Sequence, residues 1–124
     1  MSGIRTYLAA VVLACLAASG AWGNPSAPAK PVVTFIELGS VNCIPCKAMQ
    51  PVMESIRKKY PDQVSVLFYD VWTKEGAPYG QQYRIRVIPT QVFLDKDGKE
   101  YYRHEGFFPE EELVKVLAKG GVKP

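Results

Sequence analysis

Two cysteines separated by two residues, Cys43 and Cys46, are the side chains of this sequence best suited to chemistry. They lie between a β-rich run and a predicted helix, and in the first turn of a helix two such side chains can close a disulfide. The first thiol faces the helix N-terminus, where unpaired N–H groups and the helix dipole stabilise a thiolate. Because the thiolate is the attacking species in disulfide exchange, we expect Cys43 to attack and Cys46, one turn further in and less exposed, to resolve.

Other uses of a cysteine pair stay open. Two cysteines cannot complete a tetrahedral zinc site, and the only histidine, His104, is expected on a distant strand as a solvated or hydrogen-bonded residue. Copper(I) held by two thiolates is therefore the form that metal binding would take. A structural disulfide across so short a loop would restrain little of the unfolded chain. We expect no cofactor, because the cysteine pair itself carries the two electrons of a redox step.

The elements that must position these cysteines alternate along the chain. Periodicity and turn signals predict the order β-α-β-α-β-β-α. The strands are expected at 32–38, 64–71, 90–94 and 99–105, and the helices at 43–60, late in 74–83, and from Pro109 to Gly120-Gly121. A strand-helix-strand unit followed by a hairpin predicts an α/β fold with one central mixed β-sheet, flanked by helices on both faces.

The N-terminal segment reads as an export signal. Residues 1–23 contain one positive charge, a short apolar run and a cluster of small residues, and 24–31 form a Pro- and Ala-rich flexible linker. The folded domain is then expected at 32–121. Two alternatives remain open, an uncleaved N-terminal membrane anchor and a lipoprotein whose lipid is attached to Cys15. Export, to the bacterial periplasm in our interpretation, would place the cysteine pair where disulfides persist.

Composition excludes several classes of protein. A chain of 124 residues with 48% hydrophobic and 22% charged residues is of the size and character of one globular domain. The net charge of +3, with no basic run longer than Arg57-Lys58-Lys59, argues against a nucleic-acid-binding protein. Three cysteines are too few for a disulfide-stabilised miniprotein.

The residues around the motif resemble the thioredoxin superfamily over roughly 32–119. The features that carry the resemblance are Phe35-Ile36-Glu37 before the cysteines, Cys43-Ile44-Pro45-Cys46-Lys47, Pro51 inside the helix, Ile88-Pro89-Thr90, and the glycines of Asp97-Gly98 and Gly106. This resemblance implies a thioredoxin-like fold and a cis proline at Pro89. It also implies a buried acid at Glu37, beneath the second cysteine, where the family usually has Asp.

The same resemblance implies a face for substrates. An extended peptide would pair with the backbone of Ile88, Pro89 and Thr90 beside the sulfurs, next to Asn42, Ile44 and Pro45. Asn42 replaces the family's tryptophan, which leaves a smaller and more polar surface. A further set of aromatic residues is expected in the core or at its rim, with a role as a substrate platform as the alternative: Trp72, Tyr79, Tyr83, Phe107 and Phe108.

We therefore expect an exported thiol-disulfide oxidoreductase that reduces protein disulfides through Cys43 and Cys46. Its expected partners are disulfide-containing protein substrates and a membrane-embedded electron donor, because a reductant outside the cytosol must be recharged. We expect a monomer that binds no nucleic acid. One alternative is a non-enzymatic thioredoxin-like module that binds copper(I) or a protein, which the missing tryptophan favours. Another is an oxidant that acts in disulfide formation, which would share the fold and differ only in its reduction potential.

Overall fold

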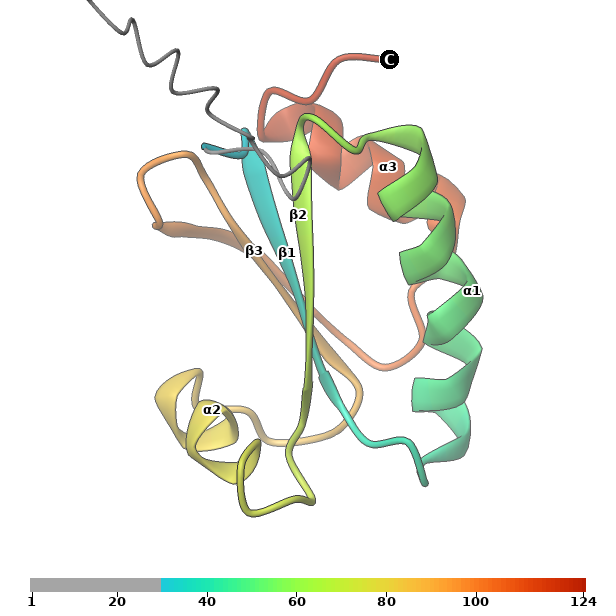
Figure 1. Cartoon of the computed structure of the whole chain (residues 1–124), viewed down its shortest axis with the longest axis vertical. Coiled ribbons are helices and arrows are strands. Elements are labelled where there is room, and N and C mark those ends of the chain that lie inside the picture. Colours follow the sequence, from blue (N-terminus) through green and yellow to red (C-terminus); the bar gives the residue numbers. More distant parts are fainter. Residues whose placement is uncertain (1–29) are drawn as a thin grey trace, which may run out of the picture.

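The structure, a computed structural model, describes residues 30–124 (Figure 1). The predicted signal segment 1–23 lies outside the described residues, together with Cys15 and its lipidation alternative. Most of the predicted linker, 24–29, lies outside them as well. Among residues 30–124, no helix combines the length and the apolar character that crossing a membrane requires.

A four-stranded sheet and three helices follow the predicted order β-α-β-α-β-β-α. The elements are β1 (Val33–Gly39), α1 (Ile44–Lys59), β2 (Val64–Asp70), α2 (Ala77–Gln82), β3 (Thr90–Leu94), β4 (Glu100–Glu105) and α3 (Glu110–Lys119). The sheet order is β2-β1-β3-β4, with β1 parallel to β2 and antiparallel to β3, and β3 antiparallel to β4. The prediction of a mixed sheet in a thioredoxin-like α/β fold is thus confirmed.

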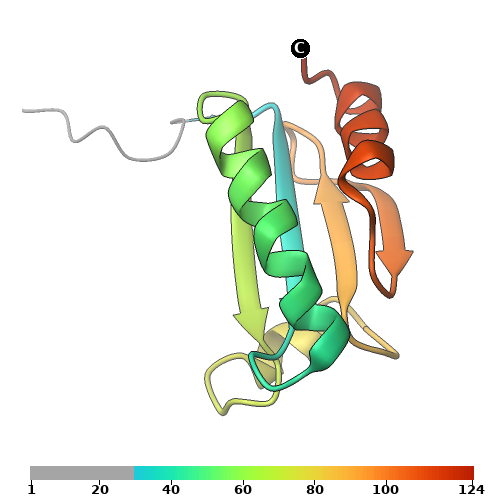
Figure 2. The same ribbon diagram turned by 90° about the vertical axis from the view of Figure 1, so that its right-hand side faces the viewer.

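Helices cover both faces of the sheet unequally. Figures 1 and 2 show α1 and α3 side by side on one face, while the short α2 lies on the other. Between the sheet and the two long helices lies the larger core, in which the rings of Phe35 and Phe93 stack 5.0 Å apart. A smaller core of Ile36, Leu38 and Val92 lies on the α2 face. Because β1 is buried on both faces, its sequence is nearly all apolar.

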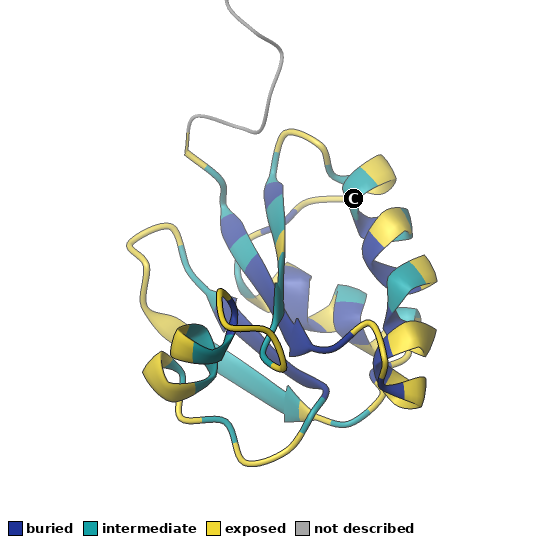
Figure 3. Ribbon diagram, turned by 60° about the horizontal axis from the view of Figure 1, so that its bottom comes forward, coloured by how far each residue is buried: buried dark blue, intermediate teal, exposed yellow. Residues whose placement is uncertain are grey.

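The burial pattern follows from this layering. Figure 3 shows that burial is greatest at the centre of the sheet, in β1 and β3, while β2 and β4 are mostly intermediate and the helices are exposed along their outer faces. Along β1 the side chains alternate, so that Val33, Phe35 and Glu37 face α1 while Ile36 and Leu38 face α2. Because of this alternation, the carboxyl group of Glu37 points toward the larger core.

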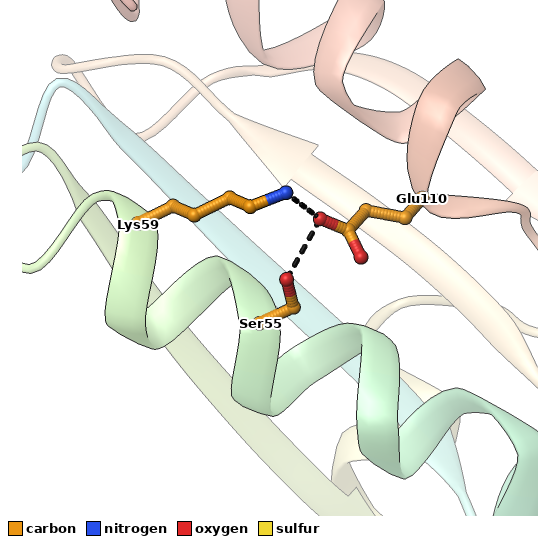
Figure 4. Close-up of polar contacts among 3 residues, drawn as sticks. All are labelled: Ser55, Lys59 and Glu110. Carbon is orange, nitrogen blue, oxygen red and sulfur yellow. Dashed lines mark hydrogen bonds and ion pairs between the residues drawn. The ribbon is translucent and has the colours of Figure 1, made fainter.

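The two long helices are also joined by polar contacts at their surface. The carboxylate of Glu110, in the first turn of α3, accepts a hydrogen bond of 2.7 Å from the Ser55 hydroxyl and forms an ion pair with Lys59 (Figure 4). These donors from α1 lower the pKa of Glu110. The contact fixes α3 against α1, the helix that begins at the cysteine pair.

Candidate active site

The two cysteines form a disulfide at the beginning of α1. Their Cα atoms are 5.1 Å apart. Cys43 is the N-cap residue in an extended conformation, and its sulfur accepts a hydrogen bond of 3.4 Å from the backbone N–H of Cys46. A sulfur at this position can accept hydrogen bonds from the free N–H groups of the first helical turn and lies at the positive end of the helix dipole. Both interactions favour the thiolate over the thiol.

The sulfurs differ in their access to solvent. Cys43 keeps 7% of its surface exposed and Cys46 none, so a second protein reaches the pair through Cys43. The neighbouring residues Asn42, Ile44 and Pro45 are exposed, and Ile44 shows 82% of its surface. The predicted order of exposure therefore holds, although Cys43 is more enclosed than a free surface thiol.

Gly39, at the end of β1, packs directly against the second cysteine. A Cβ atom added to Gly39 would lie 3.0 Å from the sulfur of Cys46 and 3.2 Å from its Cβ, closer than ordinary contact allows. Gly39 lies two residues after Glu37, on the same face of the strand. The absence of a side chain at Gly39 thus lets Cys46 pack on the face of β1 to which Glu37 also belongs.

Glu37 is completely buried, with 0% of its surface exposed, as the resemblance implied. Its Oε1 accepts a hydrogen bond of 3.3 Å from the side-chain amide of Gln91, and its Oε2 has no partner among the described residues. Burial raises the pKa of Glu37 to about 8, against a lowering contribution from the Gln91 hydrogen bond. A carboxyl group with such a pKa can take up and release a proton near neutral pH.

The proline loop reaches the same end of the sheet. Thr90 pairs with Leu38 in the register of β3 and β1, so the preceding Pro89 lies level with Gly39, against which Cys46 packs. The Ile88–Pro89 peptide bond is cis. Ile88 is half-buried and Pro89 is buried.

The side chain of Thr90 lies too deep to contact a substrate. It is buried, and its hydroxyl donates a 2.7 Å hydrogen bond to the carbonyl of Val87. Only its backbone is therefore suited to the predicted pairing with an extended peptide.

Trp72 lies in the loop after β2 with 63% of its surface exposed, and not in the core. It lines an open pocket of about 270 Å³ together with Ile85, Arg86, Val87 and Ile88. The Asp70 carboxylate accepts the backbone N–H groups of both Trp72 and Val41, at 3.0 and 3.2 Å, and so ties this loop to the segment before Cys43.

Sequence reasoning missed several residues at this site, among them Val87 and Gln91. Val87 is exposed beside the proline loop, and no pattern in the sequence distinguishes it from a core valine. Gln91 is completely buried against Glu37. A lone amide inside an otherwise apolar strand was the signal that could have identified it.

Residues 30–124 contain no group of three or more His, Cys, Asp or Glu side chains arranged to hold a metal. His104 lies on β4, half-buried, with Nε2 at 3.1 Å from the carbonyl of Phe107 and its ring stacked on Phe108. Copper(I) bound by the two thiolates of Cys43 and Cys46 stays a prediction.

Comparisons with known proteins agree with this geometry. A family profile described as a thioredoxin-like domain matches residues 26–121. The thioredoxin of Staphylococcus aureus is 32% identical over 87 residues, which cover 70% of this chain and 81% of that protein. The crystal structure of the germline-specific thioredoxin Deadhead from Drosophila melanogaster is similar with a TM-score of 0.61 at 29% identity, covering 70% of this chain and 79% of that one. Thioredoxin from Fasciola hepatica has a TM-score of 0.63 at 28% identity, with 73% and 83% covered.

Proposed function

The chain belongs to the thioredoxin-like domain family, and from this premise we propose that it is an exported reductant of protein disulfides. Its membership of this family and its Cys43–Cys46 pair together support the general class of thiol-disulfide oxidoreductases. The observation that carries the proposal is the position of Cys43 as the N-cap of α1, with its sulfur bonded to the N–H of Cys46.

The proposed reaction has two exchange steps. The Cys43 thiolate attacks a substrate disulfide, forms a mixed disulfide and displaces one substrate thiolate. Cys46 then loses its proton and attacks the sulfur of Cys43, which closes the Cys43–Cys46 disulfide and releases the second thiolate. The substrate gains the two electrons that the cysteine pair loses. One product thiolate takes the proton that left Cys46, and the other takes a proton from water.

Glu37 is suited to the proton step. Cys46 is completely buried, so water cannot readily remove its proton. The Glu37 carboxyl lies on the strand face that Cys46 covers, and its pKa of about 8 leaves part of it ionised at neutral pH. Glu37 therefore accepts the proton as Cys46 attacks and later returns it to a product thiolate.

Substrates dock on the end of the molecule around Cys43. Its exposed apolar side chains are those of Val41, Ile44, Trp72 and Val87. An extended peptide can pair with the backbone next to Pro89 while its own side chains contact this rim. Thioredoxin-like proteins act on disulfide-containing protein substrates, and this surface fits an unfolded or flexible segment.

The predicted signal segment 1–23 supports export, and export implies a supply of electrons. Outside the cytosol the Cys43–Cys46 disulfide would persist unless another dithiol reduced it. We therefore include a membrane-embedded electron donor in the proposal. Fusing residues 1–31 to a reporter that is active only after export tests the first part, and a reporter that stays in the cytosol would contradict it.

The activity is tested by the reduction of insulin disulfides with dithiothreitol as the electron source. The wild-type chain should accelerate the reaction, and Cys43→Ser should abolish the acceleration because the attacking sulfur is gone. Lys115→Ala, an exposed position on α3 that leaves the pair intact, is the control. Full activity of the Cys43→Ser variant would overturn the assignment.

Titrating the reduced protein with copper(I) tests the alternative of a binding module. We expect disulfide turnover in the same preparation and no stoichiometric tight copper binding. Tight one-to-one binding together with negligible reductase turnover would favour the binding module over the oxidoreductase.

A further inference from the structure

Gln91 is a polar side chain that lies completely buried beside Glu37. It stands directly opposite Glu37 in the register of β3 and β1, on the sheet face that α1 and α3 cover. A buried amide costs free energy unless its hydrogen bonds are satisfied. The partners of Gln91 therefore indicate why an amide occupies this position.

The side-chain nitrogen of Gln91 has two acceptors. It donates to Oε1 of Glu37 at 3.3 Å and to the carbonyl of Gly106 at 3.1 Å. A backbone carbonyl can only accept, so Gly106 fixes the orientation of the amide. The reverse orientation would place the amide oxygen against both acceptors. Gln91 consequently presents N–H to the carboxyl group and favours its ionised form.

The two remaining oxygens have no partner. Among the described residues, Oε2 of Glu37 and Oε1 of Gln91 are buried side-chain atoms without a hydrogen bond. One carboxyl oxygen is thus held, while the other is free to receive a proton. Gly106 also donates its N–H to the carbonyl of Pro89 at 2.8 Å, so one residue anchors both the proline loop and the amide.

We propose that Gln91 is a positioning residue for the redox reaction: it holds Oε1 of Glu37 and leaves Oε2 to accept the proton of Cys46. This inference rests on the proposed function. The proton moves from the Cys46 thiol to Oε2 as Cys46 attacks Cys43, and it leaves with a product thiolate. Gln91 itself exchanges no proton and touches no reacting sulfur.

Few other titratable groups face this carboxyl group. From α1, Cys46 packs on the same face of β1 at Gly39, and it does not titrate in the disulfide form. From β2 the register partner of Glu37 is the apolar Phe68, and on β4 the register partner of Gln91 is His104. The immediate surroundings of the carboxyl group are thus mostly apolar, apart from the Gln91 amide.

The first test is a carbon-13 NMR titration of Glu37 in the oxidised full chain. Replacing Gln91 by Met, which is similar in length and donates no hydrogen bond, should raise the Glu37 midpoint by about one to two pH units. His104→Gln should leave that midpoint nearly unchanged. An unchanged midpoint in Gln91→Met would overturn the proposal.

A second measurement needs no variant of Gln91, in case Gln91→Met does not fold. In the wild-type protein the side-chain amide protons of Gln91 should shift with the same midpoint as the Glu37 carboxyl carbon. Amide signals that stay constant through the Glu37 titration would contradict the inference.

The last test links the amide to the reaction. In the insulin assay, Gln91→Met should shift the acid limb of the pH–rate profile to higher pH and so lower the rate near neutral pH roughly tenfold. In a Glu37→Gln background, where no carboxyl titrates, Gln91→Met should have no further effect on the profile, and a full additional shift would refute the role. If the wild-type chain reduces no disulfide at all, the proposed function fails, while the NMR titrations still decide whether Gln91 controls Glu37.

Discussion

At the scale of single residues, the site combines one slightly exposed sulfur, one buried sulfur and one buried carboxyl group. Each has a distinct physical environment: Cys43 lies at a helix N-terminus, Cys46 lies beneath it without solvent access, and Glu37 lies in the core. A helix terminus stabilises an anion, whereas burial opposes one. These opposite effects separate an attacking thiolate from a thiol that needs a base.

Removing the resolving sulfur should trap the reaction halfway. In Cys46→Ser, Cys43 can still attack a substrate, but the mixed disulfide has no internal nucleophile to break it. We expect a stable covalent complex that mass spectrometry detects at the combined mass of the chain and its substrate. The Cys43→Ser/Cys46→Ser double variant is the control and should form none. Equal trapping by Cys43→Ser alone would mean that the order of the two thiols is reversed.

At the scale of elements, the site depends on how closely the end of β1 approaches the start of α1. Gly39 allows that approach, because any side chain there would press on the sulfur of Cys46. The register of β1 and β3 then places Pro89 at the same level. The end of β1, the start of α1 and the proline loop thus meet at a position where a side chain would crowd Cys46.

Gly39→Ala should therefore destabilise the oxidised protein by roughly 1–3 kcal/mol, the usual cost of overpacking a tight core position. Urea unfolding of the oxidised protein measures this loss. Gly80→Ala, within α2, is the matched control, since its added Cβ would meet the nearest atom, of the Val71 side chain, at 3.4 Å, an ordinary contact. Gly80→Ala should be neutral or slightly stabilising. Equal stability of Gly39→Ala and the wild type would show that the strand end is not tightly packed against Cys46.

At the scale of the whole molecule, burying Glu37 links folding to pH. The pKa of Glu37 is about 8 in the folded chain, against 4.5 as its ordinary value. Between these values the folded state keeps a proton that the unfolded state has released. Stability is therefore greatest below the unfolded pKa and declines as pH rises toward the folded pKa.

The free energy of unfolding of the oxidised protein should fall by up to about 1.4 kcal/mol per pH unit within this window, through Glu37 alone. Glu37→Gln keeps the shape of the side chain and removes the titration, so its stability should vary less between pH 5 and 8. Urea unfolding at several pH values measures both curves, and the difference between them isolates the contribution of Glu37. Parallel curves would mean that Glu37 is ionised in the folded state.

Much of this arrangement could be predicted from local features. Apolar runs, helix stop signals and the Asp97-Gly98 turn predict every strand and helix to within a few residues, because these signals act between neighbours in the chain. The spacing of Cys43 and Cys46 likewise predicts a disulfide, since one helical turn sets their separation. The thioredoxin-like architecture followed from the order of the elements and the motifs together.

Contacts between distant segments were decided only by the tertiary structure. Burial of Glu37 depends on α1 covering one face of β1, and the choice of Gln91 as its partner depends on the register of β1 and β3. The exposure of Trp72 depends on a loop that Asp70 ties to the segment before Cys43. The sequence by itself determined which groups can react. The packing of remote segments determined the environment of each group, because desolvation and hydrogen bonding arise only when those segments meet.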